Sequence, residues 1–366
     1  MTTAERFREE TLLSRPIRDL GLTIEGTALE SLVAEFLQEL HRVGIRRLRP
    51  HFYLSTQWIV NDGTIAIAIP FYLAHPELRA IHAEKTGWVE GNDRAELLGY
   101  LRHEMGHVVN YAYKLYERED WVQLFGSMTQ PYEDNYHPEP FSRRYVQHLP
   151  GWYAQKHPDE DWAETFAVWM TPGSNWRAVY LEWPEALAKL EYCDRIMASL
   201  RDRDPDVTVA ERDEDVSQLT YSLEQYYSAN GTAPEEKFPP GLDGALHAVF
   251  EAAGAASAPP SVPRVSGAAL IRRCEADLLE NVYRWTGHFP ERTWPLLRHL
   301  AHRADELQQV YPINREATVL IALTTLVASL AMNHVLRGSY FSGPERNGTP
   351  ERTSTPSLAQ PSVAAG

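Results

Sequence analysis

Two histidines and a glutamate in one short stretch, His103-Glu104-Met105-Gly106-His107, have the residue types and the spacing of a metal site. On a helix, His103 and His107 would project from the same side one turn apart, so both imidazoles could reach a single metal ion. Glu104 would lie beside them, where its carboxylate could take a proton from a metal-bound water. The alternative is a surface helix that carries two solvated histidines.

The residues around this motif predict a helix between Asn92 and Glu117. Apolar residues recur there at intervals of three and four, as they do on the buried face of an amphipathic helix: Leu97, Leu101, Met105, Val108 and Ala112. Asp93 followed by Glu96 is typical of a capped helix start. Gly106 costs about 1 kcal/mol in a helix interior relative to Ala, which indicates that another segment packs closely against it. This context favours a zinc site over two solvated histidines.

Length and charge limit the class of protein. A chain of 366 residues is expected to hold two domains, because one core rarely grows past about 250 to 300 residues. The net charge of -15 disfavours nucleic acid as a partner, since phosphate contacts need a basic face. Residues 1–20 lack the apolar run of a signal peptide, so a cytoplasmic location is expected. Only two cysteines are present, which is too few for a thiolate zinc site.

The order of β-rich and helical segments along the sequence predicts an α+β domain followed by a helical domain. Two β-rich runs, 51–60 and 64–73, flank Asn61-Asp62-Gly63 and predict a hairpin. Pro70 cannot donate to a strand ladder, so the second strand is expected to end there or to lie at a sheet edge. Such an edge could hold an extended peptide, although an edge that binds nothing is as well supported.

Composition then sets the domain boundaries. Residues 1–252 are expected to form the metal-binding domain with a helical extension, 253–263 a linker, 264–340 a helical bundle and 341–366 a disordered tail. The last helix contains an uncharged run that is short for a membrane span. A buried bundle helix is therefore predicted, and no membrane contact.

Two histidines do not complete a catalytic zinc site, because such sites generally take three protein ligands and keep a fourth position for water. Asn110 and Tyr113 stand where a metzincin-type continuation of the motif would need glycine and histidine, which excludes that continuation. The third ligand must come from elsewhere in the chain. The candidates are Glu160, Glu164, His137, His148 and His157.

The segment 160–167, Glu-Asp-Trp-Ala-Glu-Thr-Phe-Ala, together with the upstream motif resembles the gluzincin metallopeptidases. It looks most like the bacterial family called putative zinc-binding metallopeptidases, and its spacing is similar to that of the anthrax lethal factor protease. The resemblance implies a zincin-like domain with a small sheet and an active-site helix. It also implies that Glu160 is the third zinc ligand and that Glu164 is an acceptor that orients a histidine ligand. By the same resemblance, the Tyr153 hydroxyl would donate to the developing oxyanion.

These residues predict a zinc metallopeptidase, with an endopeptidase favoured over an exopeptidase. Zn²⁺ held by His103, His107 and Glu160 would activate a water, and Glu104 would shuttle its proton to the leaving amine. The expected partner is a peptide or protein substrate, and the C-terminal helices are a candidate surface for a protein partner.

Two alternatives stay open. One is an interaction protein whose zinc site is structural or idle, and the other is a zinc hydrolase that acts on non-peptide bonds. A fourth protein ligand such as His157 would favour the structural site, whereas an open fourth position favours the enzyme.

Overall fold

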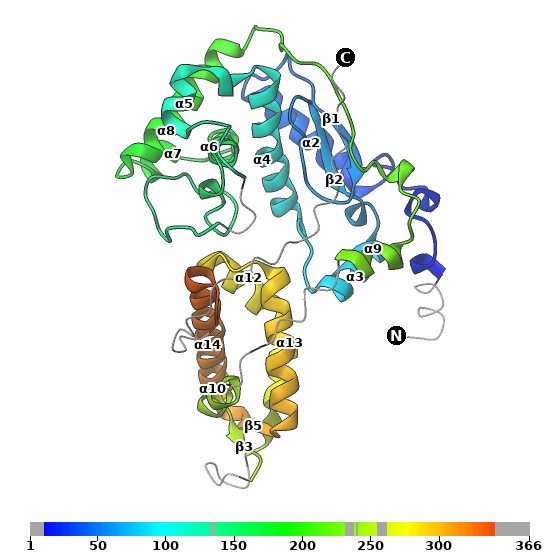
Figure 1. Cartoon of the computed structure of the whole chain (residues 1–366), viewed down its shortest axis with the longest axis vertical. Helices are drawn as coiled ribbons and strands as arrows, with labels where there is room; N and C mark the ends of the chain where they lie inside the picture. Colours follow the sequence, from blue (N-terminus) through cyan, green and yellow to red (C-terminus); the bar gives the residue numbers. More distant parts are fainter. Residues whose placement is uncertain (1–10, 133–135, 231–237, 239–240, 255–261, 341–366) are drawn as a thin grey trace, which may run out of the picture.

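The two largest hydrophobic cores divide the chain in a computed structural model that describes residues 11–132, 136–230, 238, 241–254 and 262–340. The larger core gathers residues between Ile17 and Tyr227, and the second core gathers residues between Leu242 and Tyr340. Figure 1 shows the first as the upper body and the second as an elongated helical unit below it. Helices combined with two small sheets agree with the predicted α+β class.

The elements of the larger body follow in chain order. They are η1 (Ile17–Leu20), α2 (Ala28–Arg42), β1 (His51–Ser55), β2 (Ala66–Pro70), η2 (Phe71–Ala74), α3 (Pro76–Thr86), α4 (Arg94–Ala112), η3 (Leu115–Glu117), α5 (Glu119–Phe125), η4 (Tyr153–Gln155), α6 (Pro158–Met170), α7 (Trp176–Val179), α8 (Pro184–Leu200), η5 (Val216–Gln218) and α9 (Leu223–Asn230).

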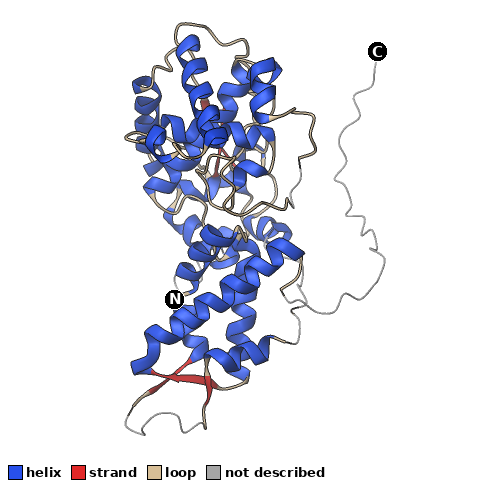
Figure 2. Ribbon diagram, turned by 90° about the vertical axis from the view of Figure 1, so that its left-hand side faces the viewer, coloured by secondary structure: helices blue, strands red, loops and turns tan. Residues whose placement is uncertain are grey.

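The helical unit has its own order of elements. They are α10 (Leu242–Val249), β3 (Glu251–Ala252), β4 (Arg264–Ser266), α11 (Gly267–Arg273), α12 (Glu275–Thr286), α13 (Pro290–Glu306), β5 (Gln309–Pro312), η6 (Ile313–Arg315) and α14 (Glu316–Arg337). Figure 2 shows the antiparallel sheet β3-β5-β4 at the end of this unit that lies farthest from the larger body.

The second core begins upstream of the linker predicted at 253–263. Leu242, Leu246 and Phe250 are buried together with residues of α11 to α14, and β3 pairs with β5. The predicted boundary at residue 252 therefore does not match the packing, because the apolar face of α10 is buried in the helical unit. Residues 255–261 of the linker and the predicted tail 341–366 lie outside the described residues.

The two strands predicted as a hairpin pair in parallel instead. β1 lies beside β2 in parallel register, while the antiparallel neighbour of β2 is a single bridge between Ile59 and Ala68. The turn at Asp62-Gly63 does form, with Gly63 at φ 72°. After β1 the chain crosses to the other side of β2 before it reaches this turn. β2 therefore has β1 on one side and the segment at Ile59 on the other, and it is fully buried. β2 ends at Pro70, which is one of the two outcomes predicted for this proline, and it does not form the open edge that was the other.

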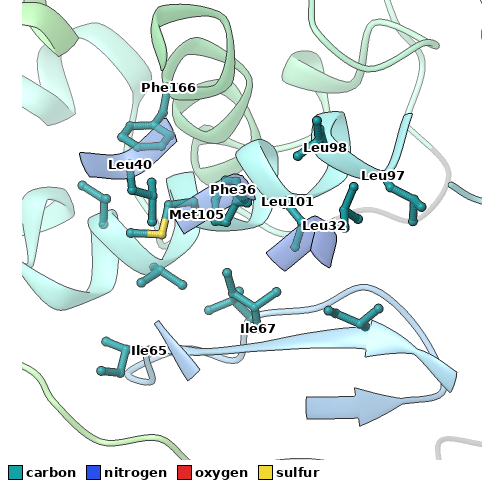
Figure 3. Close-up of a cluster of buried hydrophobic side chains, with 14 of the residues drawn as sticks. Leu32, Phe36, Leu40, Ile65, Ile67, Leu97, Leu98, Leu101, Met105 and Phe166 are labelled. Atoms are coloured by element: carbon teal, nitrogen blue, oxygen red, sulfur yellow. The ribbon is translucent and has the colours of Figure 1, made fainter. Parts of the chain in front are cut away.

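The motif helix α4 lies between the sheet and α6. It begins at Asp93, whose side chain accepts hydrogen bonds from the backbone N–H groups of Ala95 and Glu96, as the capping pattern predicted. Figure 3 shows Leu101 and Met105 of α4 gathered with apolar side chains of α2 and β2. This side of α4 faces the core, which leaves the histidine side to face α6.

The helical unit contacts the larger body through aromatic rings. The ring of Trp294 lies so close to Gly87, at φ 77°, that a Cβ atom there would be 2.2 Å from it. Tyr283 packs on Gly151 in the same way, at 3.0 Å from such a Cβ atom, and against Trp88 with ring centroids 6.5 Å apart. The contact at Gly151 lies two residues before η4, which begins with Tyr153.

The helix α14 packs in the helical unit along one face only, so the buried bundle helix that was predicted is found for that face alone. Val319, Leu323 and Val327 pack into the second core, while the side chain of Ile321 is 70% exposed. By length and composition the segment Ile313–Arg337 could cross a membrane, and 28% of its most apolar window is buried.

Candidate metal centre

The site lies where α4 crosses α6 at close range. A Cβ atom on Gly106 would be 2.6 Å from the Cα atom of Ala163, which is closer than real contacts allow. The indole N–H of Trp162 donates to the Gly106 carbonyl at 2.8 Å. The close packing predicted from a glycine inside a helix is therefore observed, and it brings the histidine side of α4 against the first turns of α6.

Three donor atoms converge in the crossing. The Nε2 atoms of His103 and His107 are 3.2 Å apart, and they lie 3.0 Å and 3.4 Å from Oε2 of Glu160. Tetrahedral zinc with ligands at about 2.0–2.1 Å has ligand-to-ligand edges of about 3.3 Å. The three side chains are buried, and their spacing fits one zinc ion.

The other ring nitrogen of each histidine faces a carboxylate. Nδ1 of His103 is 2.9 Å from Glu164 Oε1, and Nδ1 of His107 is 2.8 Å from Asp159 Oδ2. A neutral imidazole that donates from Nδ1 presents a lone pair on Nε2. The two Nε2 lone pairs and the Glu160 carboxylate are then three acceptors aimed at one point, an arrangement that a cation satisfies.

The electrostatics of the site also favour positive charge. Burial lowers the pKa of His103, but hydrogen bonds with Glu160 and Glu164 outweigh it and raise this pKa to about 9. Burial raises the pKa of Glu160, yet the two histidines hold it well below its usual range. The carboxylate is therefore ionised, and a metal ion competes with protons for the histidines.

The two carboxylates that face the histidines are themselves held in place. Oε2 of Glu164 accepts backbone N–H groups of His148 and Leu149, both at 2.8 Å. Asp159 accepts the Tyr111 hydroxyl at 2.5 Å and the Asn110 side-chain amide at 2.6 Å. Each histidine ring is thus fixed through a carboxylate that has further donors.

The sequence reasoning missed Asp159. A signal for it existed, because this residue precedes the expected ligand Glu160 by one position and so opens the same helical turn. Asn110 and Tyr111 follow His107 by three and four residues, which places them on the adjoining part of the α4 surface.

The other histidine candidates for the third ligand lie elsewhere. His157 caps α6, since its Nδ1 accepts the Asp159 N–H at 3.2 Å, and its Nε2 lies 3.2 Å from the Gln130 carbonyl. The ring of His148 contacts the Gly99 carbonyl at 2.9 Å. Among the described residues, the grouped metal donors include neither of these two histidines nor His137.

Two tyrosines and one more glutamate border the donor atoms. Tyr153 is half-buried, and its ring lies edge-on to that of His103 with centroids 5.6 Å apart. The Tyr132 hydroxyl, which the sequence reasoning did not single out, donates to Glu160 Oε1 at 2.6 Å. Glu104 is buried on α4 beside His103, and burial raises the pKa of its carboxyl while the two histidines lower it.

Comparison with known families supplies the class of this site. A family model described as "putative zinc-binding metallo-peptidase" matches residues 62–176, the segment that contains α4 and α6. The predicted resemblance to the putative zinc-binding metallopeptidases is confirmed for this segment. Zinc as the cofactor is confirmed as well, because the family binds zinc and the segment holds a buried His/His/Glu group able to bind a metal ion. No match was found among curated proteins or among solved structures.

The close crossing at Gly106 gives a first prediction. Gly106→Ala should lower the free energy of unfolding by about 1–3 kcal/mol, because the added methyl group meets the α6 backbone, and it should weaken zinc binding. Helix propensity alone predicts the opposite sign, a gain of about 1 kcal/mol. Urea unfolding and metal analysis measure the two effects.

Gly99→Ala is the matched control in the same helix. A Cβ atom there would lie 3.6 Å from the His148 ring, an ordinary contact, so this variant should be as stable as the wild type or more stable. If both variants gain stability and keep zinc, the close crossing does not hold the site together.

Proposed function

We propose that the chain is a zinc-dependent peptidase of the gluzincin type, with a zincin-like domain that cleaves bonds inside peptide or protein substrates. The observation that carries the proposal is the triangle of buried donor atoms on His103, His107 and Glu160, with a carboxylate behind each histidine. The family match over residues 62–176 supports peptidase chemistry in general.

The number of protein donors favours a catalytic centre over a structural one. Structural zinc sites are closed by four protein ligands, whereas catalytic sites use three and keep one position open. Within the described parts of the chain, the grouped donors number three. His157, whose recruitment would have favoured a structural site, is engaged as the cap of α6.

The proposed roles follow from position. His103, His107 and Glu160 would hold the zinc, which when bound supplies Lewis-acid activation of water and of the scissile carbonyl. Glu104 would accept the proton of the attacking water and return it to the leaving amine. Burial raises the pKa of Glu104, which makes its carboxylate a stronger base than a solvated one. Tyr153, beside the His103 ring, is the candidate donor to the developing oxyanion.

The test joins metal analysis to a substrate survey. The purified chain should carry about one zinc ion, cleave internal bonds in a mixed peptide library, lose this activity with a chelator and regain it with added zinc. Ester or amide hydrolysis without any peptide cleavage would point instead to a hydrolase of non-peptide bonds. Stoichiometric zinc with no hydrolysis of either kind would support a structural or idle site.

A further inference from the structure

The two oxygens of Glu160 have different neighbours. Oε2 faces the Nε2 atoms of both histidines at 3.0 Å and 3.4 Å, whereas Oε1 accepts the Tyr132 hydroxyl at 2.6 Å. A distance of 2.6 Å is typical of a charge-assisted bond from a hydroxyl to a carboxylate. The structure therefore divides Glu160 into one oxygen for the metal and one oxygen for a tyrosine.

This division has a consequence for the coordination of a metal ion. A carboxylate can bind a metal through one oxygen or through both, and a hydrogen bond to one oxygen favours binding through the other. Binding through one oxygen keeps the protein donors at three and leaves the remaining position open, as a catalytic site needs. The Tyr132 hydroxyl is in a position to enforce that choice.

The surroundings of Tyr132 argue that its hydroxyl is more important than its bulk. The residue is 50% exposed, so it contributes less to a core than a buried tyrosine does. Its ring packs against His157, with centroids 5.3 Å apart, and the Lys156 ammonium lies 4.3 Å from the ring centroid. These two contacts support the ring from the start of α6 while the hydroxyl reaches inward to Glu160.

We propose that Tyr132 is a positioning residue that holds Glu160 to the metal through a single oxygen. The inference rests on the proposed zinc centre. It goes beyond the ligand set, because it assigns a role in metal coordination to a residue 28 positions upstream of the ligand on which it acts.

The test uses Tyr132→Phe in the full chain, which removes the hydroxyl and keeps the ring. Zinc affinity, measured by competition with a chelating dye, should fall by about 10 to 100-fold, the usual range for partners of metal ligands. The visible absorption of the cobalt-substituted protein should weaken relative to wild type, because Glu160 can then bind through both oxygens and raise the coordination number.

Two further variants separate the hydroxyl from the ring. Tyr226→Phe is the matched control, because its hydroxyl donates to the Thr56 carbonyl at 3.2 Å and does not contact the proposed ligands. It should leave the zinc affinity and the cobalt spectrum unchanged. Tyr132→Leu removes ring and hydroxyl together, and it should weaken zinc binding at least as much as Tyr132→Phe.

The outcomes are distinct. Wild-type affinity and an unchanged cobalt spectrum in Tyr132→Phe overturn the inference, and a defect confined to Tyr132→Leu overturns it in favour of packing. If the wild-type chain itself binds neither zinc nor cobalt, the proposed function has failed. A metal-binding wild type with an unaffected Tyr132→Phe variant leaves the proposed function standing and removes only the role of Tyr132.

Discussion

Glu104→Gln should keep its zinc and its fold and should lose about 10² to 10⁴-fold in peptide hydrolysis, the usual contribution of a general base. The amide has nearly the size of the carboxylate but cannot accept the proton of the attacking water. Glu104 does not belong to the donor triangle, so metal content should stay at about one ion per chain. Single-turnover cleavage of a library-derived peptide, with metal analysis of the same sample, measures both quantities.

Glu96→Gln is the control for this variant. Glu96 lies on the same helix, and its carboxylate accepts the Asn92 N–H at 2.8 Å, a contact that a glutamine oxygen can still make. Its activity should equal that of the wild type. Wild-type turnover in Glu104→Gln would assign the base to another group or the activity to a contaminating protease.

Local signals in the sequence were sufficient to predict the helix that carries the motif. Asp93 caps α4 as its position predicted, and the glycine inside the motif does mark a close helix crossing. The cap depends on interactions within a few residues, and the crossing was inferred from the absence of a side chain at Gly106. Both inferences can therefore be made without knowledge of the tertiary structure.

Contacts between distant segments could not be predicted in this way. The β-rich runs around Asp62-Gly63 carry the pattern of a hairpin, but the path of the chain before the turn decides that β1 pairs in parallel. The bond from Tyr132 to Glu160 joins two segments through a loop whose course no local pattern fixes.

The boundary of the helical unit was missed for a related reason. An apolar helix face such as that of α10 can be buried against any neighbouring core, and its sequence does not say which. Only the packing of Leu242 and Leu246 with the C-terminal helices assigns α10 to the second core.

Glu160→Gln should reduce zinc binding more than any change in the groups that contact the ligands, because a neutral amide replaces the anionic oxygen nearest both histidines. We expect the zinc affinity to fall by more than the 10 to 100-fold that is typical when a residue hydrogen-bonded to a metal ligand is changed. Equilibrium dialysis against a zinc buffer, with unfolding midpoints as a check on the fold, provides the measurement.

Glu164→Gln should act through His103 and should fall within that 10 to 100-fold range. The groups that face Glu164 are the Nδ1 atom of His103 and the backbone N–H groups of His148 and Leu149. A glutamine offers only one acceptor oxygen to these donors, so at least one of them loses its partner. A buried donor left without a partner costs about 1–3 kcal/mol, so this variant should also lose stability.

His157→Asn completes the comparison, since asparagine is a favoured helix cap and can replace the ring nitrogen that accepts the Asp159 N–H. This variant should keep its fold and about one zinc ion per chain, because the other ring nitrogen of His157 faces the Gln130 carbonyl and not the donor triangle. Loss of the ring contact with Tyr132 should lower its zinc affinity less than Glu160→Gln does. Zinc loss in His157→Asn together with retention in Glu160→Gln would reverse the assignment of the third ligand. That result would also remove the argument for an open coordination position. That position is inferred from the donors on His103, His107 and Glu160, and Glu160 would then not be a ligand.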